Sequence, residues 1–489
     1  MNAFSVGGDA TVDEISSSPS PGLGGTSRAL WIILIFALAL RLGLFIGARV
    51  ATGEWDSFYQ ADSPSYLQPA REMVEHGTFT THGKPEVLRT PGYPLLMVPG
   101  VLLGHPEAVT VTLQAFLSVL TVFLVYRIAL SLTGRPRVAL LAALLCAIEP
   151  VSILYVSQLM SETFFTALMT LSLLILLRHL AAPSLARAVL LAVALASATY
   201  VRPISLYLPF AFGLGLAVHA LTQAGRRRAL LIHALVFFVL SMGFLWGWKW
   251  RNTHEAGVNR FSGIEAINLY FYNAASIFAA REGISYREMQ QRWGHPSSVD
   301  DENSWERAHP EQADWSTAQR LDFMESEGKR LILENLGEYL KIHIRGTIRV
   351  LTSRGGKEWY RLFGALPPDR GQGEESYTEG GVVAGALRAL RERPFFLLLT
   401  LTLIGISGLL YLLAFIGLFS RLFVDRWQLA TLVLTLLYFL AVCGGPIATI
   451  RFRLPLVPGL AVLAGAGLAL VLSRLTRFNS EEGARAAPE

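Results

Sequence analysis

The sequence is poor in cysteine and in charge. Its two cysteines, Cys146 and Cys443, both lie inside apolar segments, which excludes a disulfide framework and a metal site built from thiolates. Charged residues make up 16% of the 489 residues and hydrophobic residues 52%, a balance too apolar for a soluble protein of this length. The sequence therefore predicts an integral membrane protein.

Uninterrupted apolar segments of membrane-spanning length recur along the chain. Because about 20 helical residues cross a hydrocarbon core of about 30 Å, these segments predict an all-α bundle of about ten transmembrane helices. We expect the helices at residues 29–49, 107–132, 137–157, 162–180, 185–201, 203–221, 229–249, 395–419, 427–446 and 453–473.

The distribution of basic residues predicts the orientation in a cell or inner membrane. Short connections such as "TGRPRV" and "QAGRRRA" carry the excess of Arg that is typical of cytoplasmic loops, so we expect both termini to be cytoplasmic. The formal net charge of +5 does not indicate nucleic-acid binding, because the basic residues sit at alternate ends of the helices. The first 27 residues lack the basic start and cleavage site of a signal peptide.

This orientation predicts two extracytoplasmic regions, and large loops of this kind often carry function. We expect a disordered cytoplasmic tail (1–27), an N-terminal transmembrane module (28–250) whose first outer loop covers 50–106, a mostly helical extracytoplasmic region (251–394), C-terminal transmembrane helices (395–475) and a cytoplasmic tail (476–489).

The first outer loop contains the stretch "DSPSYLQPAREMVEHG", which predicts an amphipathic helix along the membrane surface. Ser63 and Pro64 are start signals and Gly77 is a stop signal, with apolar residues between them on a helical period. Asp62 comes directly before this helix, and Asp56 lies six residues earlier. We expect Asp56 to be solvated or structural.

Several arginines fall where the orientation rule predicts few basic residues. They are expected at the outer ends of helices or in the first outer loop: Arg89, Arg202, Arg251, Arg451 and Arg453. Guanidinium groups bind phosphate through a fork of donors and remain charged at any relevant pH. Together with nearby acids they predict a site for an anion whose tail lies in the lipid, such as a polyprenyl phosphate that carries a sugar.

The same stretches resemble the polytopic GT-C glycosyltransferases, above all the branch of the lipid A aminoarabinose transferases and the bacterial relatives of protein O-mannosyltransferases. "DSPSYLQPAREMVEHGTF", "EPVSILYVSQLMSETFF", "WGWKWRNTHEAGVNRFSGIEAINLY" and "RFRLPLVPGLAVLAG" carry the likeness. The resemblance implies that Asp62 is the catalytic acid, that Arg89 contacts the lipid phosphate and that Glu162 is a second functional acid. It is weakest over residues 280–394, where we expect acceptor choice to reside.

One departure from this pattern concerns metal binding. The aminoarabinose transferases have an acid directly before the basic residue, whereas here Leu88 precedes Arg89 and the nearest acid is Glu86. His76 and His82 form no ligand spacing, and neither does His254. No cofactor is certain, and a divalent metal ion stays open as a hypothesis.

The chemistry requires a base for the incoming hydroxyl and cations for the leaving phosphate, and a single displacement inverts the anomeric centre. We assign the base to Asp62, with Glu162 orienting the acceptor, assisting Asp62 or helping to bind a metal. Arg89 and Arg202 hold the phosphate with one of Arg451 and Arg453. Secondary candidates are Asp56, Tyr66, Glu86 and Arg251.

Each of these roles has a structural alternative. Asp62 could cap the surface helix, and Glu162 could sit at the start of its helix because of the helix dipole. Arg89 and Arg202 could reach to lipid headgroups. Arg41 lies inside the first apolar run with no acid at helical spacing, so we expect a structural or snorkelling side chain.

The second outer region begins its main helical pattern at Ser316 and Gln319, which form a capping-box signature before apolar residues at helical spacing. We expect a linker at 366–381 and a short surface helix at 384–394. A lipid-linked sugar flippase or another transporter is the alternative function, but internal repeats and polar breaks at mid-membrane are not evident. The sugar and the acceptor, which could be a lipid, a glycan or a protein, cannot be read from the sequence.

Overall fold

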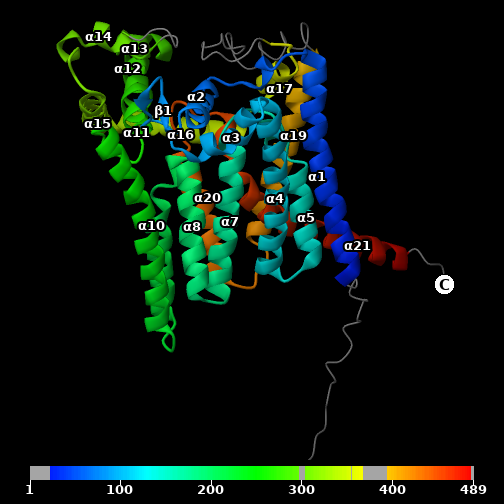
Figure 1. Cartoon of the computed structure of the whole chain (residues 1–489). Coiled ribbons are helices and arrows are strands. Elements are labelled where there is room, and N and C mark those ends of the chain that lie inside the picture. Colours follow the sequence, from blue (N-terminus) through cyan, green and yellow to red (C-terminus); the bar gives the residue numbers. More distant parts are fainter. Residues whose placement is uncertain (1–22, 297–302, 354, 367–393, 486–489) are drawn as a thin grey trace, which may run out of the picture.

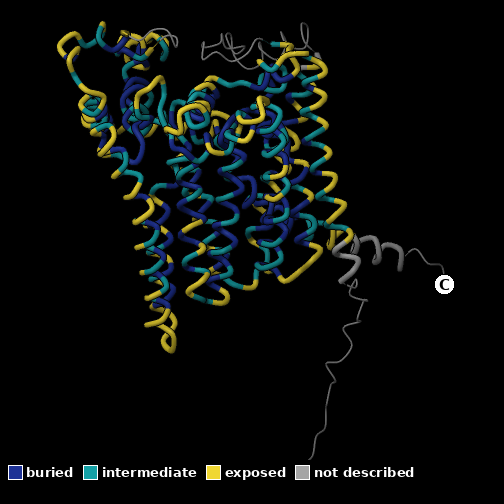
Figure 2. Tube along the Cα trace, viewed as in Figure 1, coloured by how far each residue is buried: buried dark blue, intermediate teal, exposed yellow. Residues whose placement is uncertain are grey.

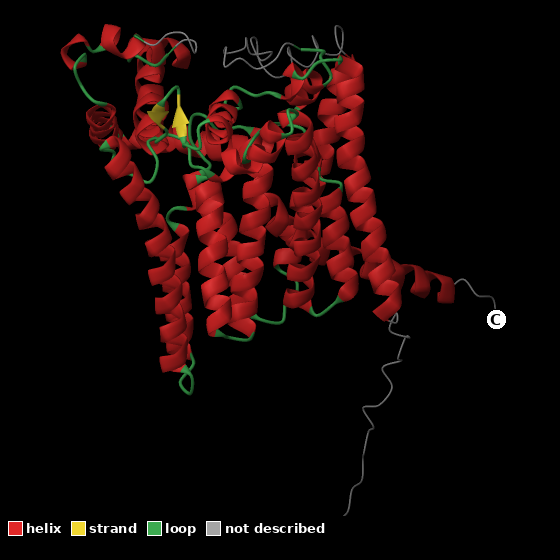
Figure 3. Cartoon of the chain, viewed as in Figure 1, coloured by secondary structure: helices red, strands yellow, loops and turns green. Residues whose placement is uncertain are grey.

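The computed structural model describes residues 23–296, 303–353, 355–366 and 394–485. Helices dominate this part of the chain, and a single two-stranded hairpin stands at one end of the helix bundle (Figure 3). The hairpin pairs β1 (Thr80–Thr81) with β2 (Lys84–Pro85) in antiparallel register. The prediction of an all-α membrane fold is therefore confirmed.

Long apolar helices form the bundle. The helices that correspond to the expected spans are α1 (Leu23–Thr52), α4 (Pro106–Thr133), α5 (Pro136–Ala147) with α6 (Pro150–Val156), α7 (Glu162–Ala181), α8 (Leu185–Val201), η2 (Pro203–Ser205) with α9 (Leu208–Thr222), α10 (Arg227–Ala256), α19 (Pro394–Leu418), α20 (Arg426–Val442) and α21 (Val457–Arg485). Within the described residues, 7 helices are long and apolar enough to cross a membrane, or up to 8 with one bent pair. Shorter apolar helices, which include α8 and α20, bring the total close to the expected number.

The span expected at 137–157 is not one straight helix. It breaks into α5 and α6, which are bent by 53°. Pro150 begins α6, and a proline cannot continue a helix because its ring clashes with the preceding turn. Glu149 adopts an extended backbone at the break, and its carboxylate accepts a hydrogen bond from the Ser152 amide at 2.7 Å.

Shorter elements gather at one end of the bundle, which we call the site end (Figure 1). They are η1 (Asp56–Phe58), α2 (Pro64–Glu75), the hairpin, α3 (Gly92–Leu102), α11 (Ile264–Ile267), the π-helix η3 (Asn268–Ala274), α12 (Ala275–Glu282), α13 (Tyr286–Arg292), α14 (Ser304–Ala308), η4 (Pro310–Gln312), α15 (Thr317–Glu334), α16 (Leu336–Thr352), α17 (Gly356–Leu362) and the 3₁₀ helix η5 (Ile450–Leu456). The segments expected as the two outer regions thus lie at the same end.

Two local expectations are confirmed and one needs correction. Helix α2 occupies the predicted stretch, and Gly77 follows it in the left-handed region at φ 68°. Ser316 and Gln319 form the predicted capping box at the start of α15. The tail expected at 1–27 extends too far, because α1 begins at Leu23. The linker at 366–381 and the surface helix at 384–394 lie almost entirely outside the described residues.

Buried residues lie mainly between the helices and exposed residues along the outside of the bundle (Figure 2), and many of the exposed residues are large and apolar. Trp31, Leu235 and Leu398 each expose 61% or more of their surface. In a bilayer such side chains contact lipid tails, so this apolar exterior is what a membrane domain requires. The protein is a multi-pass membrane protein.

Candidate active site

The charged side chains that the sequence singles out meet at the site end. Asp62 precedes α2, Arg89 precedes α3, Glu162 begins α7, Arg202 ends α8 and Arg451 lies in η5. These elements pack on one another in the core, so residues that are far apart in sequence come together. We call these five residues the charge cluster.

Asp62 lies between two guanidinium groups. Its Oδ1 accepts a hydrogen bond from Arg89 Nη2 at 2.8 Å, and its Oδ2 accepts one from Arg451 Nη1 at 2.7 Å. Burial alone would raise the pKa of Asp62, but Arg451 and Arg89 hold this pKa well below its usual range. The carboxylate is therefore ionised. It does not cap α2, because Ser63 is the residue at the N-cap position.

The turn at residues 86–89, directly before α3, directs the Arg89 side chain toward Asp62. Glu86 Oε1 accepts hydrogen bonds from the amides of Leu88 at 2.6 Å and Arg89 at 2.8 Å, which fixes the turn. The Arg89 guanidinium lies 4.7 Å from the centre of the Tyr66 ring, and its Nε donates to Ser65 Oγ at 2.9 Å. Glu86 and Tyr66 thus position Arg89.

Glu162 forms the second half of the charge cluster. Its Oε1 lies 2.5 Å from Arg202 Nη1 and 3.7 Å from Arg451 Nε. Arg202 Nη1 also donates to Ser161 Oγ at 3.1 Å. The side chain of Glu162 is 2% exposed, whereas that of Asp62 is 29% exposed. Arg451 therefore bridges an accessible acid and a buried acid.

The charge balance of the cluster favours an anionic ligand. Arg89, Arg202 and Arg451 face the carboxylates of Asp62 and Glu162, which leaves a surplus of one positive charge. A partly buried surplus charge is costly until a counter-charge binds. The single negative charge of a phosphodiester would neutralise it.

Arg453 and Arg251 do not join the charge cluster. Arg453 is buried and faces Glu149, with Nη2 3.7 Å from Oε1, and its Nη1 donates to the Tyr411 hydroxyl at 3.0 Å. Arg251 donates to the backbone carbonyls of Glu86 at 2.7 Å and of Phe79 at 2.8 Å. Arg251 thus ties α10 to the segment around the hairpin.

Asp56 also lies apart from the charge cluster. It is exposed in η1, whereas Asp62 is held by Arg89 and Arg451. The exposure agrees with the expectation that Asp56 is solvated.

Sequence reasoning missed three side chains at this site. The hydroxyl oxygens of Ser65 and Ser161 accept hydrogen bonds from Arg89 and Arg202. Tyr272 lies on the π-helix η3, a geometry that is frequent at functional sites. Burial raises the pKa of Tyr272, and the charge of Asp62 raises it further, so Tyr272 lies within electrostatic range of the charge cluster. The stretch "NLYFYNA" has no periodic signal that would mark Tyr272.

The residues at this site do not fit a protein-bound metal ion. Among the described residues, no group of three or more His, Cys, Asp or Glu side chains gathers at one point. Both oxygens of Asp62 are engaged by arginines. His76 pairs with Glu72 at 3.2 Å, and His254 stacks on Trp250 at 5.4 Å, so neither lies among the ligands of a common site.

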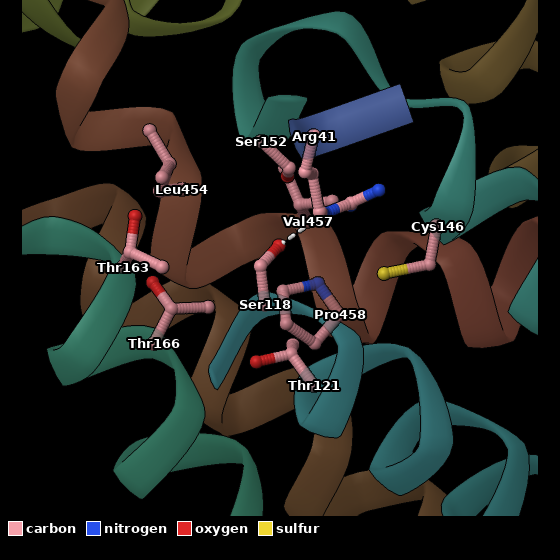
Figure 4. A pocket seen from close by; sticks show the side chains of 10 residues that line it. All are labelled: Arg41, Ser118, Thr121, Cys146, Ser152, Thr163, Thr166, Leu454, Val457 and Pro458. Carbon is pink, nitrogen blue, oxygen red and sulfur yellow. Dashed lines mark hydrogen bonds between the residues drawn. The ribbon is translucent and has the colours of Figure 1, made fainter. Parts of the chain in front are cut away.

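Arg41 lies deeper in the bundle, beside a small cavity (Figure 4). Its side chain is fully buried, which makes the snorkelling alternative wrong. Arg41 Nε donates to Ser118 Oγ at 2.6 Å, and Nη1 donates to the carbonyls of Ala37 and Ala147 at 3.0 Å each. The cavity offers about 10 Å³ to the centre of a water molecule, room for about one water. Arg41 thus stabilises the packing of α1, α4 and α5.

Comparison with known proteins gives one family match and several structural neighbours. Residues 89–248 match the family model described as dolichyl-phosphate-mannose-protein mannosyltransferase, which is less than half of the chain. No curated protein sequence matches the chain.

The structural neighbours include an oligosaccharyltransferase of Archaeoglobus fulgidus, solved with a tethered acceptor peptide. It is 15% identical, with a TM-score of 0.51, and the alignment covers 96% of this chain and 52% of the other. The chain therefore spans about half the length of that enzyme, and the likeness shows a shared fold.

A second neighbour is ArnT from Cupriavidus metallidurans, solved bound to undecaprenyl phosphate, at 15% identity and a TM-score of 0.36, covering 91% of this chain and 78% of the other. Over residues 89–248 the chain is thus similar to the dolichyl-phosphate-mannose-protein mannosyltransferase family, and it shares the fold of the oligosaccharyltransferase.

Proposed function

We propose that the protein transfers a sugar from a polyprenyl-phosphate donor to an acceptor hydroxyl, with inversion at the anomeric carbon. The observation that carries this proposal is the charge cluster, in which three arginines and two acids leave one positive charge in a partly buried site. A lipid-linked phosphodiester has the matching charge and a tail suited to the bilayer. The matched family is named for a donor of this kind.

We propose that this site faces the extracytoplasmic side. The arginine-rich connections around Arg135 and Arg227 lie at the end of the bundle opposite the site end (Figure 1). Connections rich in Arg are retained in the cytoplasm. The sugar donor would then be used on the outer face, where a lipid, a glycan or a protein could serve as acceptor.

In this proposal the donor phosphate competes with Asp62 for its arginines. The phosphate offers Arg89 and Arg451 the same kind of oxygen acceptors that Asp62 offers in the resting site. When these guanidinium groups turn to the phosphate, the interactions that lower the pKa of Asp62 weaken. Donor binding thereby converts a weak base into a stronger one. Arg202, paired with Glu162, adds positive charge from the buried side.

The transfer step then needs no covalent intermediate. Asp62 accepts the proton of the acceptor hydroxyl while the acceptor oxygen forms a bond to the anomeric carbon. The bond between that carbon and the phosphate oxygen breaks, and its electron pair goes to the phosphate. Arg89 and Arg451 stabilise the charge that develops on the leaving group, the role that preorganised cations serve in phosphoryl and glycosyl chemistry.

The test is turnover of radiolabelled polyprenyl-phosphate sugars by purified protein, with a membrane extract as the acceptor source. We expect wild type to release lipid phosphate from one donor and Asp62→Asn to lose this activity while it stays folded. Asp56→Asn is the matched control, because Asp56 is an exposed acid of the same loop outside the charge cluster. Equal activity in wild type and Asp62→Asn would overturn the assignment of the base. Movement of intact donor across vesicles without cleavage would favour a flippase instead.

A further inference from the structure

Helix α16 packs on the membrane bundle through one of its faces. Gly346 fits so closely against the backbone of Gly445 that an added Cβ would overlap it. His343 Nε2 lies 2.8 Å from the carbonyl oxygen of Ala441, the second-last residue of α20. Because α20 is an apolar helix, this contact places α16 where the hydrocarbon layer ends.

A second face of α16 carries a row of exposed aliphatic side chains. Leu336, Leu340, Ile344 and Ile348 are spaced by four residues and expose 46%, 48%, 57% and 55% of their surface. Side chains four residues apart line up on a helix, so these four form one continuous apolar stripe. A helix surrounded by water does not leave such a stripe uncovered.

The third face of α16 is basic. Lys341, Arg345 and Arg349 are exposed at a spacing of four, next to the apolar stripe. The acid of this face, Glu338, pairs with Arg281 at 3.4 Å and also lies within electrostatic range of Lys341. Arg349 donates to a backbone carbonyl at 3.3 Å, which leaves Lys341 and Arg345 as the basic pair that faces outward.

We propose that α16 is a binding site for an anionic phospholipid of the leaflet at the site end. Acyl chains contact the apolar stripe, and the headgroup phosphate binds Lys341 and Arg345. One face of α16 packs on the bundle, the next is apolar and the third is basic. A helix at the boundary between hydrocarbon and headgroups needs this arrangement, because its apolar face contacts acyl chains and its basic face contacts headgroups. The basic pair next to the stripe selects an anionic lipid over a neutral one, because a zwitterionic headgroup has no net charge to offset.

The site has a consequence for η5. Helix α16 packs on η5, which carries Arg451, so a lipid that holds α16 also steadies that arginine. This consequence rests on the proposed function, whereas lipid binding itself does not.

Spin labels at two adjacent positions test the placement of α16. Labels are attached at Ile344→Cys and Arg345→Cys in protein reconstituted in phosphatidylcholine and phosphatidylglycerol. The native cysteines are both buried and so poorly accessible to the reagent. We expect the label at 344 to be relaxed by oxygen and protected from a water-soluble nickel complex, and the label at 345 to show the reverse. If nickel reaches both labels equally, the stripe faces water and the proposal is overturned.

Lipid retention tests the basic pair. We expect the double variant Lys341→Gln/Arg345→Gln to bind phosphatidylglycerol roughly 30-fold more weakly by native mass spectrometry, since each basic residue near an anionic surface contributes about fivefold. The control is Lys329→Gln/Arg330→Gln on α15, which removes the same charge from two exposed residues. The proposal would be overturned if both double variants lost phosphatidylglycerol binding equally. It would also be overturned if the apolar stripe were buried in a dimer and the Lys341→Gln/Arg345→Gln variant retained phosphatidylglycerol like wild type. Both tests are independent of turnover, so their outcome is separate from that of the proposed function.

Discussion

Replacement of Arg451 by Met is expected to change both the rate and its pH dependence. The guanidinium lies 2.7 Å from Asp62 and 3.7 Å from Glu162, so one side chain serves both acids. At an effective dielectric constant of about 20, each pair at about 4 Å is worth at most about 4 kcal/mol before desolvation is subtracted. Loss of a preorganised cation from a developing oxyanion costs about 10²- to 10³-fold in kcat, and we expect a loss of this size.

The pH dependence of the Arg451→Met variant gives an independent readout. In wild type Arg451 and Arg89 hold the pKa of Asp62 below its usual range, so the carboxylate contributes stability above the ordinary carboxyl pKa of about 3.9 and loses it as the pH falls through the lowered value. Without Arg451 this pKa rises. The acid limb of kcat/KM should therefore move to higher pH.

The assay is transfer of radiolabel from the donor, measured from acid to neutral pH for wild type, Arg451→Met and Arg451→Lys. Lysine keeps the charge but has no fork of donors, so we expect it to recover part of kcat and to keep the acid limb near that of wild type. An Arg451→Met variant with unchanged kcat, or an acid limb that does not move, would refute the reasoning.

Three further predictions concern the supports of the site. Arg453→Met should lower the free energy of unfolding by about 3–5 kcal/mol because it leaves the buried carboxylate of Glu149 without its cation, and thermal unfolding combined with a Glu149→Gln rescue would reveal this. Gly346→Ala should lower the melting temperature because its Cβ overlaps a neighbouring backbone, whereas Gly337→Ala, with open space around it, should not. Glu86→Gln should weaken donor binding more than it changes thermal stability, since the turn before α3 loses a charged acceptor for two amides; unchanged KM would contradict this role.

Length and apolarity predict the membrane part of the fold well. The bundle helices are long, and their apolar runs are interrupted by short basic connections, so each span leaves a strong local signal. The sequence does not predict the break at Glu149 and Pro150, because apolar residues resume directly after it and the whole run has the length of one span. Glu149 and Pro150 both mark the position, but prolines also occur within membrane helices.

The sequence predicts the charge cluster better than it predicts individual roles. The first outer loop supplies both Asp62 and Arg89, and the sequence predicts that the arginines at helix ends lie at the same interface. The structure brings Arg451 to Asp62 and Arg202 to Glu162 there. The choice between Arg451 and Arg453 depends on η5. Two residues apart on a 3₁₀ helix differ by about 240° in direction, so one side chain faces Asp62 and the other is buried.

The sequence around Tyr272 does not predict that this residue lies near the charge cluster. It lies on a π-helix within an aromatic stretch, and the wider turn of a π-helix shifts its side chains off the α-helical period.

The most direct test of the central claim is binding of a polyprenyl phosphate to the Asp62→Asn variant, beside its turnover. The claim is that Asp62 and the lipid phosphate compete for Arg89 and Arg451. The account predicts that Asp62→Asn binds the lipid phosphate at least as tightly as wild type, because the arginines are released, while transfer is lost. An Asp62→Asn variant that binds the lipid phosphate more weakly, or that still transfers the sugar, would contradict the account.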